Sequence, residues 1–315
     1  MRLVLRYPSQ FFFLLPVGHG SRTFITAVVS LFLAVLPVAA QTHRASNFKP
    51  SILPSHLDAS EQNSYLQSLR NQRIDGDYCL KFQLIHKPRR GSSQYYDGTL
   101  YGSFIENRPM IRVLLEATGH LGSELSGSAE VLAEIIIHGA VSSSAWIRRD
   151  LSDTFLLMQG TETLNPIVPN LLFRTFDLQM PYVYWKNYLY VGPDRVGRAG
   201  GVQVFNMYPP AESPAALTGV EYVRIALDNS YSALRRASII SIGEAVESVL
   251  ETRSFAKVQN QWILREVALT DPTTKDATSF KVSSVALGIT LDGSIFNPVS
   301  KIQLPILESN YFEDL

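Results

Sequence analysis

The sequence predicts an α+β fold that consists mainly of antiparallel β-structure, with helices on one side of the sheet. Three β-rich runs, at residues 248–258, 261–270 and 277–290, are separated only by short polar turns, as in a three-stranded meander. The run at 277–290 alternates apolar and polar residues, so one face is expected to be buried and the other to face water. The run at 261–270 carries apolar side chains on both faces and therefore needs a cover on each side.

The two faces of this middle run set the expected architecture. One face holds Ile263, Val267 and Leu269, and the other holds Trp262, Leu264 and Ala268. Helices on one side of the sheet and a sheltered apolar hollow on the other would supply the two covers. Because the alternation continues along the chain after residue 56, we expect one domain.

The preceding elements follow from the same patterns. A helix is expected from Leu57, with Asp58 or Ser60 as its N-cap, and it ends near residues 73–76. Alternating runs after it predict strands at 78–86, 94–106, 110–116, 134–138, 144–149, 155–158, 202–208, 220–227 and 233–240. Residues 193–201, which are rich in glycine, are expected to form a turn.

One segment departs from the alternation. Residues 171–191, LLFRTFDLQMPYVYWKNYLYV, hold seven aromatic residues in what reads as a long irregular connection. Each aromatic ring can bury about 150–250 Å², so the group either packs in the core or forms the wall of an apolar binding site. Loops often carry function, which favours the second interpretation. The candidate ligand-binding residues are Phe176, Leu178, Met180, Tyr182, Tyr184, Trp185 and Tyr188.

The N-terminal region reads as a targeting segment. An uncharged apolar run at 23–40 follows Arg22 and ends in small residues, as a secretory signal does, so we expect cleavage after Ala40. Residues 41–56 are then an extended linker. The alternative is an uncleaved membrane anchor, since the run approaches the length of a membrane span, but Pro37 and the alanine-rich end favour cleavage.

Composition excludes several classes of protein. Basic and acidic residues number 28 each, and no basic stripe is present, so we do not expect nucleic acid as a partner. Removing residues 1–40 takes away three arginines and no acids, which makes the mature chain mildly acidic. The single cysteine, Cys79, excludes a disulfide within the chain and a cysteine-based zinc site, and we expect it in the core.

Motifs for catalysis are absent from the sequence. It contains no Gly-x-Ser-x-Gly elbow, Walker A loop, dinucleotide fingerprint or His-Glu-x-x-His pair. The histidines lack the spacing of metal ligands, and His86 and His138, at expected strand ends, are interpreted as structural. We therefore expect no metal, no cofactor and no enzymatic activity. Catalytic triads are defined in space, so a secreted hydrolase remains a third hypothesis.

Four segments carry a resemblance to a known family: FDLQMPYVYW (176–185), VGR (196–198), VRIALDNSYSALRRA (223–237) and VQNQWILREVALTDPTTKDATSFKVSSVAL (258–287). They are similar to the bacterial outer-membrane lipoprotein-sorting proteins, the LolA-like group, and in particular to its larger envelope branch. With the N-terminal helix and first strands, the similarity spans residues 57–292. These motifs are structural and not catalytic.

The resemblance implies a fold, a place and a ligand class. The fold would be a half-open antiparallel barrel over residues 57–297, with helices across its open side and residues 298–315 as a tail. Its concave apolar face would hold the acyl chains of a lipoprotein or another lipid in the periplasm, with transient membrane contact. The chain departs from the compact carriers in its length and in the aromatic insertion at 176–190, which would plug the hollow.

Two hypotheses from different classes follow. The leading one is a periplasmic carrier or binding protein for an amphiphilic ligand, in which the aromatic segment forms a wall or lid. The runner-up is an envelope sensor or scaffold, which binds a protein partner through the same half-barrel and fills its hollow with its own side chains.

Overall fold

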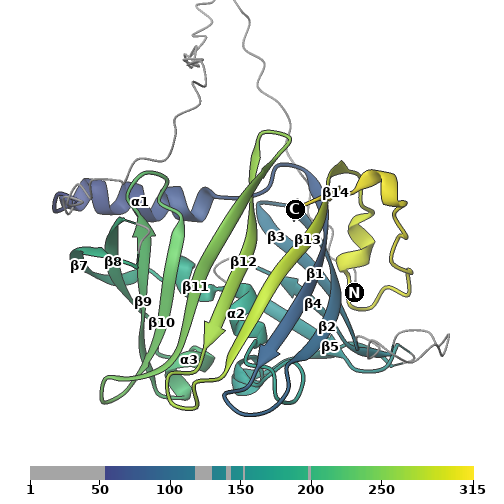
Figure 1. Cartoon of the computed structure of the whole chain (residues 1–315), viewed down its shortest axis with the longest axis horizontal. Coiled ribbons are helices and arrows are strands. Elements are labelled where there is room, and N and C mark those ends of the chain that lie inside the picture. Colours follow the sequence, from purple (N-terminus) through teal and green to yellow (C-terminus); the bar gives the residue numbers. More distant parts are fainter. Residues whose placement is uncertain (1–53, 118–129, 140–142, 152, 198–199) are drawn as a thin grey trace, which may run out of the picture. The chain divides into compact units, whose positions relative to one another are not determined.

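The computed structural model describes residues 54–117, 130–139, 143–151, 153–197 and 200–315, and they form a curled antiparallel sheet with helices inside the curl (Figure 1). This is the expected α+β half-barrel. The expected signal at 1–40 and most of the expected linker lie outside the described residues. Within the described part of the chain, no helix is both long enough and apolar enough to cross a membrane.

The sheet consists of two meanders. The first comprises β1 (Asp77–Lys87), β2 (Gln94–Ile105), β3 (Arg108–Ala117), β4 (Val131–His138), β5 (Ser144–Arg148) and β6 (Leu156–Leu157). The second comprises β7 (Asn187–Arg195), β8 (Gly201–Tyr208), β9 (Val220–Asp228), β10 (Leu234–Ser241), β11 (Ala245–Val258), β12 (Gln261–Thr270) and β13 (Ala277–Ile289). In each meander, strands that follow one another in sequence pair with one another.

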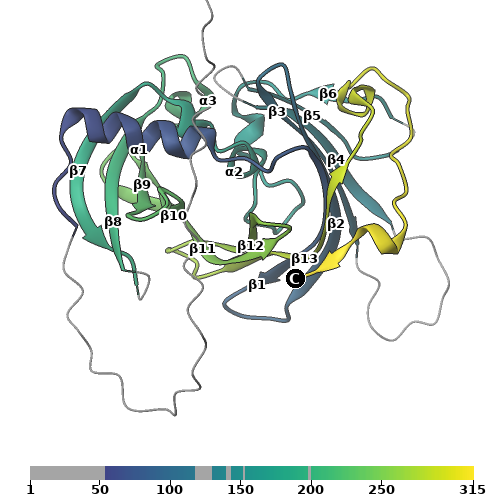
Figure 2. The same ribbon diagram turned by 90° about the horizontal axis from the view of Figure 1, so that it is seen from above.

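The pairing of β1 with β13 joins the two meanders. It runs from Asp77 opposite Ile289 to Lys87 opposite Ala277. The strand order is therefore β6-β5-β4-β3-β2-β1-β13-β12-β11-β10-β9-β8-β7, which leaves β6 and β7 at the two edges. Seen from above, the two meanders curl toward each other without closing (Figure 2).

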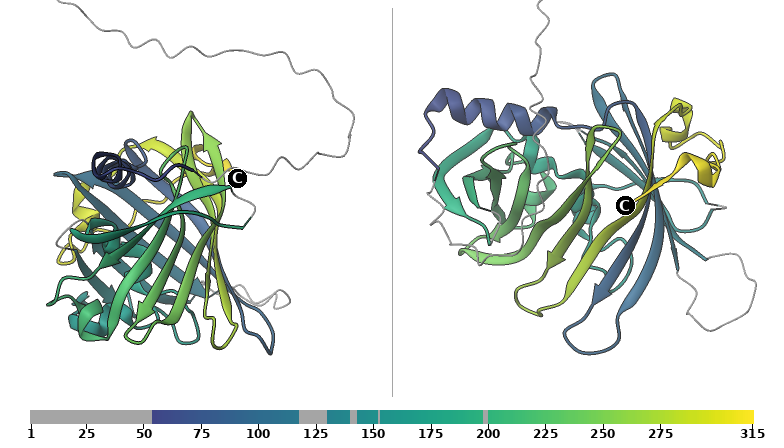
Figure 3. Two further views of the ribbon diagram at one scale, coloured as in Figure 1. Left: turned by 90° about the vertical axis from the view of Figure 1, so that its left-hand side faces the viewer. Right: turned by 45° about the horizontal axis from the view of Figure 1, so that its top comes forward.

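Helix α1 (Ala59–Asn71) lies across the upper ends of the second-meander strands (Figure 3). Its N-cap is Asp58, whose carboxylate accepts hydrogen bonds from the backbone N–H groups of Ser60 and Glu61 and completes a capping box, as expected from the sequence. Leu66 and Leu69 are its buried residues. Tyr188 of β7 contacts this helix, because its hydroxyl donates a hydrogen bond of 3.0 Å to Asn63 Oδ1.

The remaining short helices occupy two places. Inside the curl lie η1 (Gly160–Leu164), α2 (Thr175–Gln179), η2 (Pro181–Tyr184) and α3 (Pro214–Leu217). Outside it lie η3 (Gly293–Phe296) and η4 (Ser309–Tyr311), and the short strand β14 (Glu313–Asp314) pairs with β13.

The final meander matches the sequence prediction closely. Strand β12 has the expected bounds, β13 ends one residue earlier and β11 begins three residues earlier than expected. Gln259 and Asn260 form the two-residue turn with φ angles of 45° and 68°. In β13, Phe280 and Val282 are buried while Lys281 is exposed. On the second face of β12 the expected cover is incomplete, because Trp262 is 62% exposed.

Strand β7 corrects the prediction of an irregular connection and a turn. Residues 187–195 pair with β8, and Pro193 lies within the strand. An edge strand tolerates proline because its outer N–H groups need no partner strand. A register shift near Gly192, which has a φ of +125°, further disrupts the alternation from which strands are recognised.

A second apolar cluster lies on the outer face of the sheet. Cys79, Tyr101 and Ala286 face outward there, and Ile295 and Phe296 of η3 cover them. Cys79 is 1% exposed, which confirms its expected place in a core, and burial raises the pKa of its thiol to about 12.

A buried charged network lies beside this cluster. Glu134 accepts hydrogen bonds from Arg112 Nε at 2.5 Å and Arg148 Nε at 2.6 Å, and Arg112 also donates to the main-chain oxygen of Ile295 at 2.7 Å. The Arg112 and Glu134 side chains are at most 2% exposed. Such charges are tolerated inside a protein only when they are paired and hydrogen-bonded, as they are here.

The sheet divides between β12 and β13. Strand β12 pairs with only the first five residues of β13, from Ala277 to Lys281. Beyond that point β14 takes its place, with Asp314 opposite Ser284 and Glu313 opposite Val285. The C-terminal segment therefore completes the sheet where β12 diverges.

Candidate functional site

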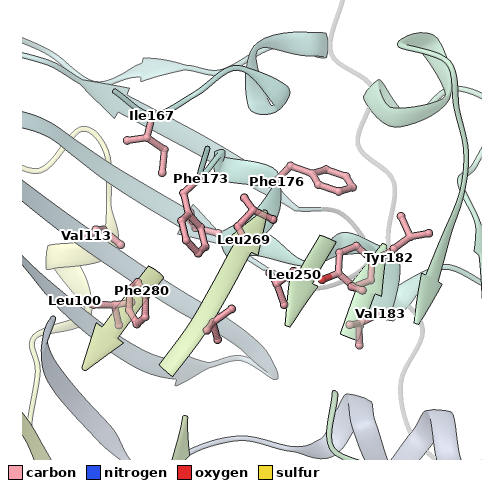
Figure 4. Close-up of a cluster of buried hydrophobic side chains, with 14 of the residues drawn as sticks. Leu100, Val113, Ile167, Phe173, Phe176, Tyr182, Val183, Leu250, Leu269 and Phe280 are labelled. Carbon is pink, nitrogen blue, oxygen red and sulfur yellow. The ribbon is translucent and has the colours of Figure 1, made fainter. Parts of the chain in front are cut away.

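The central hollow of the half-barrel is filled by the chain itself. Ile167, Phe173 and Leu178, from the segment between β6 and β7, pack against strand residues such as Val113 and Phe280 (Figure 4). The space left between them has a volume of only about 10 Å³ and is lined by apolar side chains. No acyl chain fits in the hollow while this segment occupies it.

Helices α2 and η2 hold the filling segment in place. Arg174 forms two hydrogen bonds to the carboxylate of Asp177, at 2.9 and 3.0 Å, and a third to Ser248 of β11 at 3.0 Å. Met180 ends α2 in the left-handed region, with a φ of 45°, and Pro181 begins η2 immediately after it. This break turns the chain so that α2 and η2 both face the sheet.

Arg70 of α1 fixes the other end of the segment. Its Nε donates to the main-chain oxygen of Val183 at 2.9 Å, and its Nη2 donates to that of Trp185 at 3.0 Å. Arg70 thereby satisfies one carbonyl of η2, that of Val183, and the carbonyl of its C-cap residue, Trp185. Residue 186 thus lies between a clamped helix end and the start of β7.

The seven residues proposed from the sequence do not form one wall. Phe176, Tyr182 and Trp185 are buried in the main core, with exposed fractions of 3%, 2% and 7%. The side chains of the other four, Leu178, Met180, Tyr184 and Tyr188, pack against the same core and are partly exposed. A ligand-binding role for these seven stays a prediction.

A larger opening lies where the sheet fails to close. This lateral cleft has a volume of about 630 Å³, within the range of small-molecule sites. One side is formed by β5 and β6 of the first meander, and the other by the start of β7 and the end of β8. The cleft is lined by Ser143, Ser144, Ala145, Leu157, Met158, Gly160, Thr163, Phe176, Gln179, Pro181, Tyr184, Trp185, Lys186, Asn187, Tyr208, Pro210, Ser213, Pro214 and Ala215.

The lateral cleft combines an apolar wall with a polar margin. Three of the predicted residues, Phe176, Tyr184 and Trp185, belong to its wall. Leu157 is 47% exposed there, so part of its apolar surface is open to a ligand. An apolar wall with a few polar groups is the arrangement that binds amphiphiles.

Sequence reasoning missed most of this site. Ala145 and Leu157 lie on the neighbouring strands β5 and β6, Pro214 lies on α3 more than fifty positions later, and no motif connects them. The density of aromatic residues was the only signal, and it located one wall of the lateral cleft.

His86 and His138 make contacts within the fold. His86 Nδ1 lies 2.9 Å from the hydroxyl of Thr278, which is fully buried, so no substrate reaches that oxygen. His138 Nε2 lies 2.8 Å from the main-chain oxygen of Phe296. Their interpretation as structural residues stays a prediction. In the described part of the chain, no three His, Cys, Asp or Glu residues come together as metal ligands.

Comparisons with known proteins bear on the fold. No family model matches the chain, and no curated protein does. Among solved structures, the chain is similar to an outer-membrane lipoprotein-sorting protein domain from Vibrio parahaemolyticus, with a TM-score of 0.61 and 14% identity over 74% of this chain and 94% of that one.

Two further structures agree. A DUF1329 family protein from Desulfovibrio piger has a TM-score of 0.61 and 11% identity, over 75% of this chain and 96% of that one. A LolA superfamily protein from Nitrosomonas europaea has a TM-score of 0.52 and 10% identity over the same shares. At such identities the likeness concerns the fold, and it confirms the fold expected from the resemblance.

Proposed function

We propose that this chain, which has the LolA-like fold, is a non-enzymatic carrier or binding protein for an acylated or otherwise amphiphilic ligand of the bacterial envelope. The observation that carries the proposal is the lateral cleft, because it is the large apolar opening that the filled hollow leaves. The predicted signal at residues 1–40 supports a periplasmic location.

The energetics favour an acyl chain in such a cleft. Each methylene removed from water contributes about 0.8 kcal/mol, so a chain that lies along the exposed parts of Leu157 and Tyr184 offsets part of the cost of leaving a membrane. The similar Vibrio protein is described as a lipoprotein-sorting protein, which supports a lipidated protein as one ligand of this class.

A pair of matched variants tests the proposal. Leu157→Asp places a charge on the wall of the lateral cleft, and we expect it to weaken binding of a fluorescent fatty-acid probe by about tenfold or more. Leu189→Asp is the control, because Leu189 is similarly exposed, at 54%, and lies on β7 outside the cleft. Equal binding by both variants would argue against this site.

Mass spectrometry of the secreted protein supplies a second test. Samples measured under native conditions and after organic extraction would be compared for lipids that co-purify. A stoichiometric acyl species supports the carrier function and identifies the class of cargo.

A second candidate function rests on the filled hollow. Since Ile167, Phe173 and Leu178 occupy the space in which a carrier would hold its cargo, the half-barrel also suits an envelope sensor or scaffold that binds a protein partner. Protein that purifies without lipid and fails to bind the fatty-acid probe would favour this function over the carrier.

A further inference from the structure

Lys186 sets the charge of the lateral cleft. Of the described residues that line the cleft, it is the only Lys, Arg, Asp or Glu. Its side chain is exposed, and none of the ion pairs within the described ranges includes it. The cleft therefore offers a ligand one positive charge that is not already neutralised.

Three acidic residues belong to the segments that contribute to the cleft, but none of them lines it. Asp177, on α2, is held by two hydrogen bonds from Arg174. Glu162, on η1, accepts the backbone N–H of Gln159 at 2.7 Å. Glu212 is exposed beside Ser213 but does not line the cleft. The remaining polar groups of the margin, such as Thr163 and Asn187, are neutral.

The main chain that carries Lys186 is fixed on both sides. Arg70 binds the main-chain oxygens of Val183 and Trp185, and Asn187 begins β7, where it pairs with Tyr208. The apolar wall begins at the adjacent Trp185. A flexible ammonium group thus extends from a rigid base at the boundary between the apolar wall and solvent.

We propose that the lateral cleft selects acyl chains that end in an anionic group, a carboxylate or a phosphate, and that Lys186 binds that group. This inference rests on the proposed function, since it names the head group of the ligand for the same cleft. The acyl chain lies against the apolar wall, and the anion contacts the ammonium group. A cationic head group in that position would be repelled.

The test measures head-group preference at constant chain length. Dodecanoate, dodecyl phosphate, dodecanol and dodecylamine are titrated calorimetrically, below their micellar concentrations, into the full chain. We expect the two anions to bind about tenfold more tightly than the alcohol, as for one charge contact at a partly exposed site, and the amine to bind most weakly. Added salt should reduce this preference.

Variants of Lys186 connect the preference to one residue. Lys186→Met keeps the aliphatic stem and should bring the anions to the affinity of the alcohol, while Lys186→Glu should favour the amine. Lys186→Arg should retain the preference for anions. Lys257→Met, at an exposed lysine of β11 outside the cleft, is the matched control.

Each outcome bears on the inference. Tighter binding of only one anion supports it and identifies carboxylate or phosphate as the recognised group. Equal binding of all four compounds, unaffected by Lys186→Glu, overturns the inference and leaves the proposed function standing. Binding of none of them overturns both.

Discussion

Arg265 and Leu315, fifty positions apart in sequence, are joined by a hydrogen bond of 2.9 Å from Arg265 Nη2 to the main-chain oxygen of Leu315. Arg265 belongs to the half of β12 that has separated from β13. The backbone N–H of Leu315 donates to the main-chain oxygen of Ser283 on β13 at 2.8 Å, and its side chain packs against the main core. Residue 315 thus bridges the two strands where the sheet divides.

Removal of residues 312–315 is expected to destabilise the protein by about 2–4 kcal/mol, because it removes the β14 pairing, the burial of Leu315 and the contact of Lys81 with the Phe312 ring. Urea denaturation measures the change. Arg265→Ala should cost less, about 0.5–1.5 kcal/mol, because it removes one hydrogen bond. An unchanged urea midpoint after truncation would show that the segment does not hold the two strands together.

Glu134→Gln is expected to lower the free energy of unfolding by about 3–5 kcal/mol, because it leaves Arg112 buried without an opposing charge. The matched control is Glu251→Gln on β11. Glu251 pairs with Arg236 and Arg253 at a partly exposed site, so its loss should cost less, about 1 kcal/mol. Similar losses in the two variants would contradict the burial argument.

Tyr182→Phe is expected to leave stability unchanged or raise it by up to about 1 kcal/mol. The Tyr182 hydroxyl is buried and has no hydrogen-bond partner within the described ranges, and burial raises the pKa of this group. Tyr190→Phe is the opposite case, because the Tyr190 hydroxyl accepts from the Leu57 N–H at 3.0 Å and lies 2.6 Å from Gln203 Oε1.

Thermal and urea unfolding of these two variants measure the contrast. Tyr190→Phe should lose about 1–3 kcal/mol, since it leaves two polar groups without a partner. A loss of similar size in Tyr182→Phe would mean that an ordered water satisfies the Tyr182 hydroxyl.

Trp185→Ala is expected to cost about 3–5 kcal/mol, because its side chain is 7% exposed and packs against Phe176 and Tyr182. Tyr184→Ala should cost less, since Tyr184 is only partly buried. Circular dichroism and urea denaturation distinguish the two. If only Trp185→Ala loses ligand binding, the loss is therefore attributed to disturbed folding and not to a lost ligand contact.

Acidification below about pH 6.5 is expected to destabilise the protein in part through His86. Burial holds the pKa of His86 below its ordinary value, although Asp276 acts in the opposite direction. The unfolded chain therefore takes up a proton that the folded chain resists, so stability decreases as the pH falls through that range. His86→Gln should show a smaller loss between pH 7.5 and 5.5 in urea denaturation. Identical pH dependence in both proteins would assign the effect to other groups.

The sequence predicted those features that depend on residues close to one another in the chain, such as helix caps, turns and strand alternation. The Asp58 cap, the turn at Gln259–Asn260 and the alternating faces of β13 each depend on residues close in sequence, so they could be identified before the fold was known. The pairing of β1 with β13 could not be predicted from the sequence, because each of these strands could pair with several other apolar strands.

The candidate site depends on long-range packing. The aromatic residues from Phe176 to Tyr188 were identified, but their division between core and cleft depends on how α2 and η2 turn at Met180. Lys186 carries no sequence signal of its own. It became a candidate only when the lining of the cleft and the ion pair between Asp177 and Arg174 were known.

The joining of the two meanders by β1 and β13 has a consequence for folding kinetics. Within each meander, consecutive strands are separated by at most 13 residues, whereas β1 and β13 are separated by almost two hundred. Contacts of such high sequence separation close slowly because of their entropic cost. We expect the two halves to acquire protection from hydrogen exchange early and the β1–β13 ladder to acquire it last. If the chain is exported N-terminus first, the edge of β1 that pairs with β13 would therefore stay unpaired until β13 emerges.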